Sequence, residues 1–315
     1  MTRPAVELRA VTKRFGKVEA VSAMDLSVAA GSLTGFIGPN GAGKSTSIRM
    51  IMSIIRPDSG SVEVLGADAI AAKDRIGYLP EERGLYRRMR VTEFLCYMAT
   101  LKGVPSHGLR ARVRAWLERV QLPEAGHKRC QELSKGQQQK VQFVASVIHE
   151  PELIILDEPF SGLDPVNARL LNRLIREIHS TGRTIVFSTH VMHQAEQLCD
   201  RIVLINRGRK VIDATLQEIR ARFDPRVVEA EPLDGDARAA DALARVPGVA
   251  SAQWSPERRA AELALAPGAD AQAVMGAAVA SMPMRHVALR RTTLDDVFVE
   301  LVGEAAPPSE ESGNG

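Results

Sequence analysis

The sequence predicts an α/β fold with a mixed sheet core, an antiparallel β subdomain and an inserted α-helical subdomain, followed by a small C-terminal α+β domain. A glycine-rich segment at 38–46 stands between an apolar run and a helical pattern, as in loops that join a parallel strand to a helix. Residues 91–150 show helical periodicity in place of the strand pattern, which indicates the inserted helices. Past residue 225 the composition shifts to Ala, Arg and acidic residues, which indicates a second domain.

Composition and charge favour a folded intracellular protein. The 315 residues are 45% apolar, enough for a substantial core, and the three cysteines lack CxxC spacing, which favours a reducing cytoplasm. No apolar stretch approaches the roughly 18–20 residues that cross a bilayer, and the first four residues do not start a signal peptide. The net charge of +3 divides into −6 for residues 226–315, which hold 8 Arg and 14 acidic residues, and therefore +9 for residues 1–225. This charge is too small and too interspersed to predict nucleic-acid binding.

The segment at 38–46 predicts a phosphate site. Its spacing fits G-x-x-x-x-G-K-[ST], and its glycines allow backbone N–H groups to converge on an anion at the N-terminus of the following helix. We expect Lys44 to reach the outer phosphates of a polyphosphate, the hydroxyl of Ser45 to ligate Mg²⁺, and Thr46 to fix the loop. A glycine-rich turn without a ligand is the alternative. The expected binding residues are Gly38, Pro39, Asn40, Gly41, Ala42, Gly43, Lys44, Ser45 and Thr46.

Residues 5–30 alternate apolar and polar side chains on either side of a turn at Phe15 and Gly16. The alternation predicts two antiparallel strands with one solvent-exposed face. Phe15 is a candidate for stacking on a purine ring, and ordinary packing at a strand end is the alternative.

The residues after the phosphate loop predict a helix and then two strands. Residues 56–60, with a Pro and a Gly, are expected to stop the helix, and residues 61–66 and 75–80 are expected to be strands. Glu81 and Glu82 follow the second strand directly. They either point toward the metal end of a nucleotide or form a solvated acidic turn.

A capping box is expected near the end of the helical insertion. Ser134 and Gln137 have the spacing in which each side chain caps the backbone of the other, so Ser134 is the predicted N-cap of a helix. Gly136 lies in the first turn, where it disfavours the helix by about 1 kcal/mol. Its presence suggests that another group approaches the backbone closely, whereas an ordinary helix cap is the alternative.

A buried strand at 153–156 ends in two acids. Ligands of open α/β sheets bind at the carboxyl edge of the strands, so Asp157 is a candidate for holding Mg²⁺ and Glu158 for polarising a water molecule. An acidic turn without a ligand is the alternative. His190 follows the predicted strand at 184–189 and is expected at the same edge, where a ring N–H could contact a terminal phosphate.

Five segments occur in a characteristic order: GPNGAGKST, LSKGQ, LIILDEP, SGLD and STH. Together they resemble the nucleotide-binding subunits of ATP-binding cassette (ABC) transporters, a group of P-loop NTPases, over roughly residues 4–220. The resemblance implies an ABC nucleotide-binding domain at 1–222, with its helical subdomain at about 88–150. It also implies ATP and Mg²⁺ as cofactors and ATP hydrolysis as the reaction.

Residue roles follow from the resemblance by position. It implies that Phe15 stacks on adenine, that 38–46 is the Walker A loop, and that Asp157 is the Walker B acid. Glu158 is then the catalytic base and His190 the switch histidine, with Lys44 also acting on the phosphates. Asp164 matches the D-loop acid.

Two positions depart from the commonest family pattern. Glu81 stands where Gln is usual. A carboxylate at this position accepts hydrogen bonds or ligates Mg²⁺ but does not donate. With Glu81 included, the metal ligands that the resemblance implies are Ser45, Asp157 and Glu81. Lys135 replaces the first glycine of the signature LSGGQ. The segment GYLPEERGLY resembles bacterial ABC-2 exporters, including the sodium- and drug-efflux branch.

The resemblance implies a site shared between two subunits. ATP on the Walker A loop of one subunit is expected to be capped by Ser134, Gly136 and Gln137 of a second copy or of a paralogous ATPase. An integral membrane permease is the other expected partner, with the protein at the cytoplasmic face of the cell membrane and no nucleic acid. The alternative is a soluble ABC ATPase in translation or DNA maintenance, and a phosphate-loop kinase is a third class.

The last 90 residues predict a small accessory domain at 226–303 and a disordered tail at 304–315. Strands are expected at 226–231, 261–266 and 287–291, and helices at 237–245 and 271–282, an order compatible with a ferredoxin-like module. The ending TTLDDVFVEL resembles the tail of many ABC-2 ATPases. Structural bracing or dimer support is favoured for this domain over ligand sensing.

Overall fold

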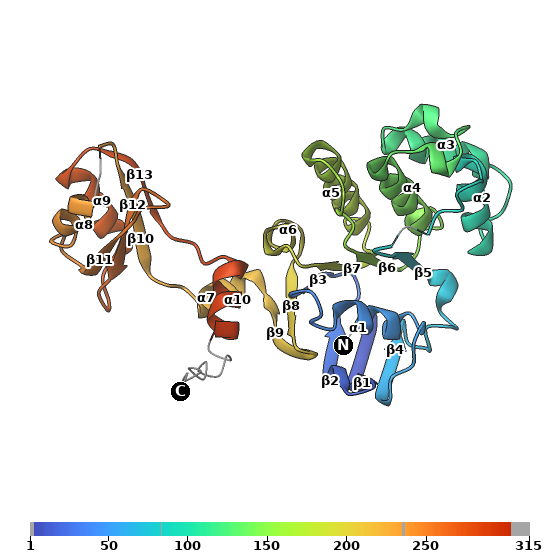
Figure 1. Cartoon of the computed structure of the whole chain (residues 1–315), viewed down its shortest axis with the longest axis horizontal. Coiled ribbons are helices and arrows are strands. Elements are labelled where there is room, and N and C mark those ends of the chain that lie inside the picture. Colours follow the sequence, from blue (N-terminus) through green and yellow to red (C-terminus); the bar gives the residue numbers. More distant parts are fainter. Residues whose placement is uncertain (1–2, 83, 235–236, 304–315) are drawn as a thin grey trace, which may run out of the picture. The chain divides into compact units, whose positions relative to one another are not determined.

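The computed structural model describes residues 3–82, 84–234 and 237–303, and the chain divides into two units at about residue 216 (Figure 1). The second unit begins at Gln217, before the boundary expected at residue 226. The predicted disordered tail lies outside the described residues.

A six-stranded sheet forms the centre of the first unit. Its strands lie in the order β5-β6-β7-β3-β8-β9, parallel except for the antiparallel edge pair β8–β9. Because Asp157 pairs with Ser188 and Ile37 with Thr189, the carboxyl ends of β3, β6 and β7 form one edge. The strands are β3 (Leu33–Ile37), β5 (Ile76–Leu79), β6 (Leu153–Asp157), β7 (Thr184–Thr189), β8 (Arg201–Asn206) and β9 (Arg209–Thr215).

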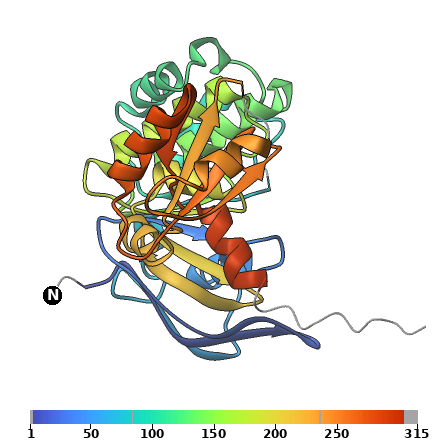
Figure 2. The same ribbon diagram turned by 90° about the vertical axis from the view of Figure 1, so that its left-hand side faces the viewer.

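The predicted antiparallel subdomain is present. It consists of β1 (Val6–Phe15), β2 (Val18–Val28) and β4 (Ser59–Val64) in the order β2-β1-β4, and Figure 2 shows the long β1–β2 ribbon along its length. Its inward apolar side chains share one buried core with the helix α1 (Lys44–Ile51) and the six-stranded sheet. Ala42 of the phosphate loop is part of this core.

The helix α1 ends at Ile51, earlier than the stop expected at 56–60. Ser53 adopts a left-handed backbone with φ of 52°, and the N–H groups of Ile54 and Ile55 both donate to the Arg49 carbonyl. The apolar residues after Ile51 continue the helical spacing, but this turn redirects the chain toward β4.

The inserted helices are α2 (Val91–Leu101), α3 (Leu109–Arg119) and α4 (Lys135–Val147), which confirms the predicted helical subdomain. Short 3₁₀ turns at 123–125 and 130–132 lie between α3 and α4, and another at 73–75 leads into β5. The helices α4, α5 (Pro165–His179) and α6 (Met192–Leu198) cover one face of the six-stranded sheet, and α1 lies on the other (Figure 1). The short helix α6 was not predicted, because seven residues give too weak a periodicity.

The second unit has the predicted ferredoxin-like arrangement. Its elements run β-α-β-β-α-β, and all its strand pairs are antiparallel in the order β11-β12-β10-β13. Buried residues of both helices and the sheet form one core. The elements are β10 (Val227–Pro232), α8 (Ala237–Leu243), β11 (Val249–Ser255), β12 (Ala260–Leu265), α9 (Ala271–Ser281) and β13 (Met284–Leu289), flanked by α7 (Leu216–Arg222) and α10 (Leu294–Gly303).

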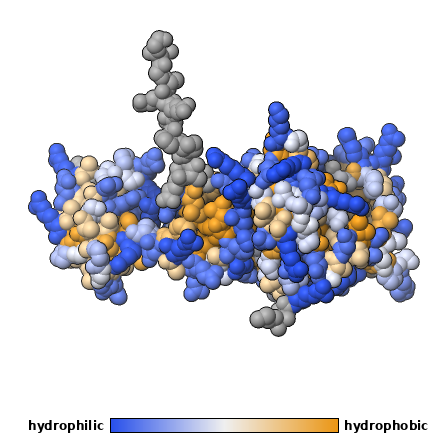
Figure 3. Space-filling view, turned by 90° about the horizontal axis from the view of Figure 1, so that it is seen from below, coloured by the Kyte–Doolittle hydropathy of each residue, from blue (hydrophilic) through white to orange (hydrophobic). Residues whose placement is uncertain are grey.

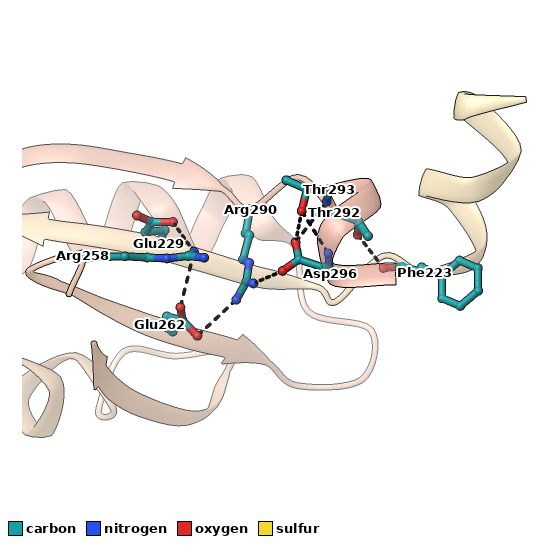
Figure 4. A network of polar contacts seen from close by, with 8 residues as sticks. All are labelled: Phe223, Glu229, Arg258, Glu262, Arg290, Thr292, Thr293 and Asp296. Carbon is teal, nitrogen blue, oxygen red and sulfur yellow. Dashed lines mark hydrogen bonds and ion pairs between the residues drawn. The ribbon is translucent and has the colours of Figure 1, made fainter. Parts of the chain in front are cut away.

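Polar contacts fasten α10 to this sheet (Figure 4). The guanidinium of Arg290, directly after β13, donates to Asp296 Oδ1 at 2.9 Å and to Glu262 Oε2 at 3.3 Å. Thr293 caps α10 through Asp296, and the hydroxyl of Thr292 donates to the Phe223 carbonyl after α7. The last helix is therefore tied to both the sheet and the segment that enters the unit.

Replacing Arg290 by methionine should lower the stability of the second unit by about 1 kcal/mol, which is a few degrees in Tm. The side chain is 21% exposed and pairs with two carboxylates, so its loss leaves both without their shared cation. Scanning calorimetry of the full chain measures the shift. The control is Arg258→Met: Arg258 is 43% exposed and its contacts with Glu229 and Glu262 are 3.4 and 3.5 Å long, so a larger shift in the control would contradict the ranking.

In the described part of the chain, no helix combines the length and the apolar character needed to cross a bilayer. The face shown in Figure 3 carries hydrophilic residues among the hydrophobic ones on each of the two units.

Candidate active site

The predicted phosphate loop follows β3 and leads into α1. Gly38 and Gly43 have φ of 152° and 105°. A Cβ atom at Gly38 would lie 2.1 Å from the Ile205 carbonyl oxygen, and one at Gly43 would lie 2.5 Å from that of Ala20. Only glycine fits these two positions, because backbone lies on the outside of the loop and cannot move away cheaply.

Lys44, the first residue of α1, is buried against the loop. Its Nζ donates to the carbonyl oxygens of Gly38 at 2.7 Å and Pro39 at 3.0 Å. Burial lowers the pKa of Lys44, whereas the nearby carboxylates of Glu158 and Asp157 act to raise it. The loop thus holds the Lys44 ammonium group near the carboxylates of Glu158 and Asp157.

A pocket of about 430 Å³ lies over the loop. This volume falls in the range of small-molecule sites. Ser45 and Thr46 are half-buried and belong to the pocket lining. The first turn of α1 adds the partial positive charge of a helix N-terminus. Its lining comprises Ala20, Asn40, Gly41, Ala42, Gly43, Lys44, Ser45, Thr46, Glu81 and Glu158. A helix N-terminus, a lysine, two hydroxyl side chains and two carboxylates around one pocket fit a metal-bound polyphosphate.

Asp157 ends β6 and is 3% exposed. The hydroxyl of Ser188, its partner in the β6–β7 register, donates to Oδ1 at 2.7 Å. Burial raises the pKa of Asp157, and the negative charges of Glu81 and Glu158 raise it further. A divalent cation would offset this concentration of negative charge.

Glu158 leaves the strand in a left-handed conformation with φ of 49°, a costly backbone state for a residue with a Cβ. Its own N–H donates to the Ser188 carbonyl at 3.0 Å. Glu158 Oε1 accepts from the backbone N–H of His190 at 2.9 Å and lies 2.7 Å from its Nδ1. A carboxylate only accepts, so Nδ1 carries the proton in this contact.

The second carboxylate oxygen of Glu158 lies 3.2 Å from the hydroxyl of Thr189, which is also 3.0 Å from the Gln194 side-chain oxygen. The His190 side chain is half exposed, whereas that of Glu158 is 11% exposed. Ser188, Thr189 and Gln194 were not among the expected site residues. Ser188 and Thr189 lie at a strand end and within the segment STH, and these were the available signals for the two residues.

The capping box at the start of α4 is confirmed: the Gln137 N–H donates to Ser134 Oγ at 3.3 Å, and the Ser134 N–H donates to Gln137 Oε1 at 3.0 Å. A Cβ at Gly136 would meet nothing closer than Leu163 Cδ2 at 3.4 Å. Packing within this chain therefore tolerates a side chain at Gly136. Neither Ser134, Gly136 nor Gln137 lines the phosphate-loop pocket.

Asp164 is the N-cap of α5. Its Oδ1 accepts from the N–H groups of Val166 and Asn167 at 3.0 and 2.9 Å. These backbone hydrogen bonds lower the pKa of Asp164, and the bond from Asn167 has the largest effect. The carboxylate is exposed and does not line the pocket.

Phe15 and Glu81 differ in their relation to the pocket. Phe15, at the end of β1, is 51% exposed, lies 5.6 Å from Lys13 Nζ and is not part of the pocket lining. Glu81 is exposed just after β5 and lines the pocket. Among the described residues, no cluster of three or more His, Cys, Asp or Glu is arranged to hold a metal ion by itself. The sheet edge therefore unites the phosphate loop, Glu81, Asp157, Glu158 and His190.

Comparison with known proteins identifies the family. Residues 21–161 match the model of the ABC transporter family, and residues 215–302 match that of the C-terminal domain of DrrA1-3-like ATP-binding proteins. YhaQ from Bacillus subtilis, an uncharacterized ABC transporter ATP-binding protein, is 38% identical over 294 residues, which cover 93% of this chain and 97% of that one. The chain belongs to the ATP-binding subunits of ABC transporters.

Further relatives of this ABC subunit agree. The daunorubicin resistance ATP-binding protein DrrA3 of Streptomyces coeruleorubidus is 34% identical over 318 residues, with 96% of this chain and 98% of that one covered. A solved structure of an ATP-binding subunit of an ABC transporter superposes with a TM-score of 0.65 at 30% identity, covering 70% of this chain and 93% of the other. The predicted ABC cassette, ATPase activity and ABC-2 exporter type are confirmed, and the translation or DNA-maintenance alternative has no support.

Proposed function

We propose that this ABC subunit binds MgATP between two copies of itself, or beside a paralogous ATPase, and uses closure and reopening to drive a separate permease at the cytoplasmic face of the membrane. The observation that carries the proposal is the composition of the pocket. Its lining includes the phosphate loop and the carboxylate of Glu158, but none of the signature residues Ser134, Gly136 and Gln137. One chain thus presents only half of the expected nucleotide contacts.

In the proposed site, Lys44 and the N–H groups of the loop bind the phosphates. The oxygens of Ser45 and Asp157 would hold Mg²⁺, with Glu81 as a further ligand. The cation would supply positive charge that neutralises the phosphate oxygens during the reaction. Phe15 is proposed to stack on adenine from its exposed position at the end of β1.

Glu158 is proposed as the base that polarises the attacking water. Two N–H groups of His190 hold one of its carboxylate oxygens, which fixes the side chain before any nucleotide arrives. His190, half exposed beside it, is proposed to sense the terminal phosphate by exchanging this contact. The signature residues of the second copy, with its D-loop acid Asp164, would complete the enclosure and exclude water.

The proposed permease contact lies where the chain enters the helical subdomain, near Glu81. Tyr86 and Tyr97 are 51% and 43% exposed, and the Tyr86 ring packs edge-on against Tyr97 and Phe94 with centroids 5.7 and 6.0 Å apart. Exposed aromatic clusters are typical of protein interfaces. Because Tyr86 follows Glu81 by five residues in the chain, a permease segment bound at this cluster would sense changes at the metal end of the pocket. Co-purification with a multi-spanning membrane protein, lost on Tyr86→Ala/Tyr97→Ala, tests this assignment.

A mixing experiment tests the shared site. Lys44→Ala removes the phosphate-binding cation, and Gly136→Asp places a negative charge where the second copy's triphosphate is expected. Gly136→Asp should leave the chain folded, because the position has room for a Cβ and an acid in the first turn suits the helix dipole. Each variant alone should lack ATPase activity. In an equimolar mixture half of the dimers are mixed and each has one intact site, so about a quarter of the wild-type rate should return.

The control mixture pairs Gly136→Asp with a chain that carries both substitutions. Mixed dimers then contain no intact site, and no activity should return. Recovery in the control, or no recovery in the first mixture, would contradict a site shared between copies.

A further inference from the structure

Lys140 is a buried cation that the proposed hydrolysis does not use. It lies on α4 and is 5% exposed. Within the described residues its Nζ forms no ion pair and donates to the side-chain oxygen of Asn167, on α5, at 3.0 Å. Burial lowers the pKa of Lys140, and the charge of Asp164 opposes that shift. A buried lysine costs stability, so its placement calls for a function.

Asn167 also contacts Asp164, the acid of the D-loop. Its Nδ2 donates to Asp164 Oδ2 at 2.6 Å, and its backbone N–H donates to Asp164 Oδ1. Since lysine only donates and a carboxylate only accepts, the orientation of the Asn167 amide is fixed, with its oxygen toward Lys140 and its nitrogen toward Asp164. The amide therefore links a cation of α4 to the acid that caps α5.

The neighbouring residue on α4 makes a second attachment. Gln139 is 2% exposed, and its Nε2 donates to the carbonyl oxygen of Pro159 at 3.0 Å. Pro159 directly follows Glu158. Two consecutive buried side chains of α4 thus hold the start and the end of the segment 159–167, and Ser134 and Gly136 lie at the N-terminus of the same helix.

We infer that Lys140, acting through Asn167, is a positioning residue that locks the D-loop acid Asp164 to the signature helix, so that both meet the second copy's nucleotide as one rigid surface. The inference rests on the proposed shared site. Its physical basis is pre-organisation: groups that must act together across an interface cost less to order when they are already fixed to each other.

The test compares Lys140→Met, Lys140→Arg and Asn167→Asp in the full chain. Methionine keeps the length and apolar stem of Lys140 but removes the donor, so D-loop positioning should be lost without a large void. We expect kcat for ATP to fall about tenfold, and dimerisation of the MgATP-loaded Glu158→Gln background to weaken by about as much. The affinity of the Walker A pocket for a fluorescent ATP analogue and the Tm should change little. Arginine retains a charged donor and should restore most of the kcat.

Asn167→Asp separates positioning from general damage. The new carboxylate still accepts from Lys140 but faces Asp164 with a like charge instead of a donor, so kcat should fall as in Lys140→Met. Wild-type kcat in both variants would overturn the inference, as would a parallel loss of Tm and analogue affinity without rescue by arginine. The mixing experiment keeps the two proposals distinct: if activity returns there but Lys140→Met behaves as wild type, only this inference fails.

Discussion

Replacing Glu158 by glutamine should reduce ATP turnover by about 10²–10⁴-fold while the subunit still binds MgATP. Glutamine preserves the size of the side chain and one carbonyl oxygen, which can still accept from the N–H groups of His190. It does not act as a base toward water. The phosphate loop and Asp157 are unchanged, so binding of a fluorescent ATP analogue should remain close to wild type. Steady-state phosphate release measures the turnover.

Glu152→Gln is the matched control. Glu152 precedes the amino end of the same strand β6, is exposed and pairs with Arg75 at 2.6 Å. Its replacement should leave turnover within about twofold of wild type, because exposed ion pairs contribute little. Turnover at the wild-type rate in Glu158→Gln would exclude Glu158 as the base.

Replacing Lys44 by alanine should weaken MgATP binding by at least about 100-fold. Among the described residues that line the pocket, Lys44 is the only cation, so the substitution leaves Glu81 and Glu158 facing the phosphates without it. Loss of a charged contact in a buried site costs about 3–5 kcal/mol when its partners stay buried. Isothermal titration calorimetry measures the affinity.

Lys128→Ala provides the control for Lys44→Ala, because Lys128 is exposed and does not line the pocket. Its affinity for MgATP should equal that of the wild type. An affinity of Lys44→Ala within a few-fold of wild type would contradict the role of Lys44.

Local signals in the sequence were sufficient to predict the main architecture. Alternation predicted β1 and β2, and the glycines and Lys44 predicted the phosphate loop. The strand β11 was missed because its side chains are mostly half-buried or exposed at a sheet edge, which blurs the period-two pattern. The early end of α1 was missed because the turn at Ser53 follows backbone geometry that an apolar pattern does not encode.

The site was predictable only in part, for a reason that follows from topology. Parallel strands end at one edge, so Asp157 and His190 could be expected near the phosphate loop. The contact of His190 with Glu158 could not, because it depends on the left-handed backbone at Glu158. The link from Lys140 to Asn167 joins residues of two helices that are 27 positions apart in the chain, and it leaves no periodic signal.

The mass of Glu158→Gln in solution tests the central claim, that a nucleotide is enclosed between two copies. Light scattering after size-exclusion chromatography compares the variant with and without MgATP. The predicted result is that the measured molar mass rises from about that of one chain to that of two when MgATP is added. Gly136→Asp should abolish this rise. The account would be contradicted by a variant that binds MgATP yet stays a single copy, both alone and in complex with its permease.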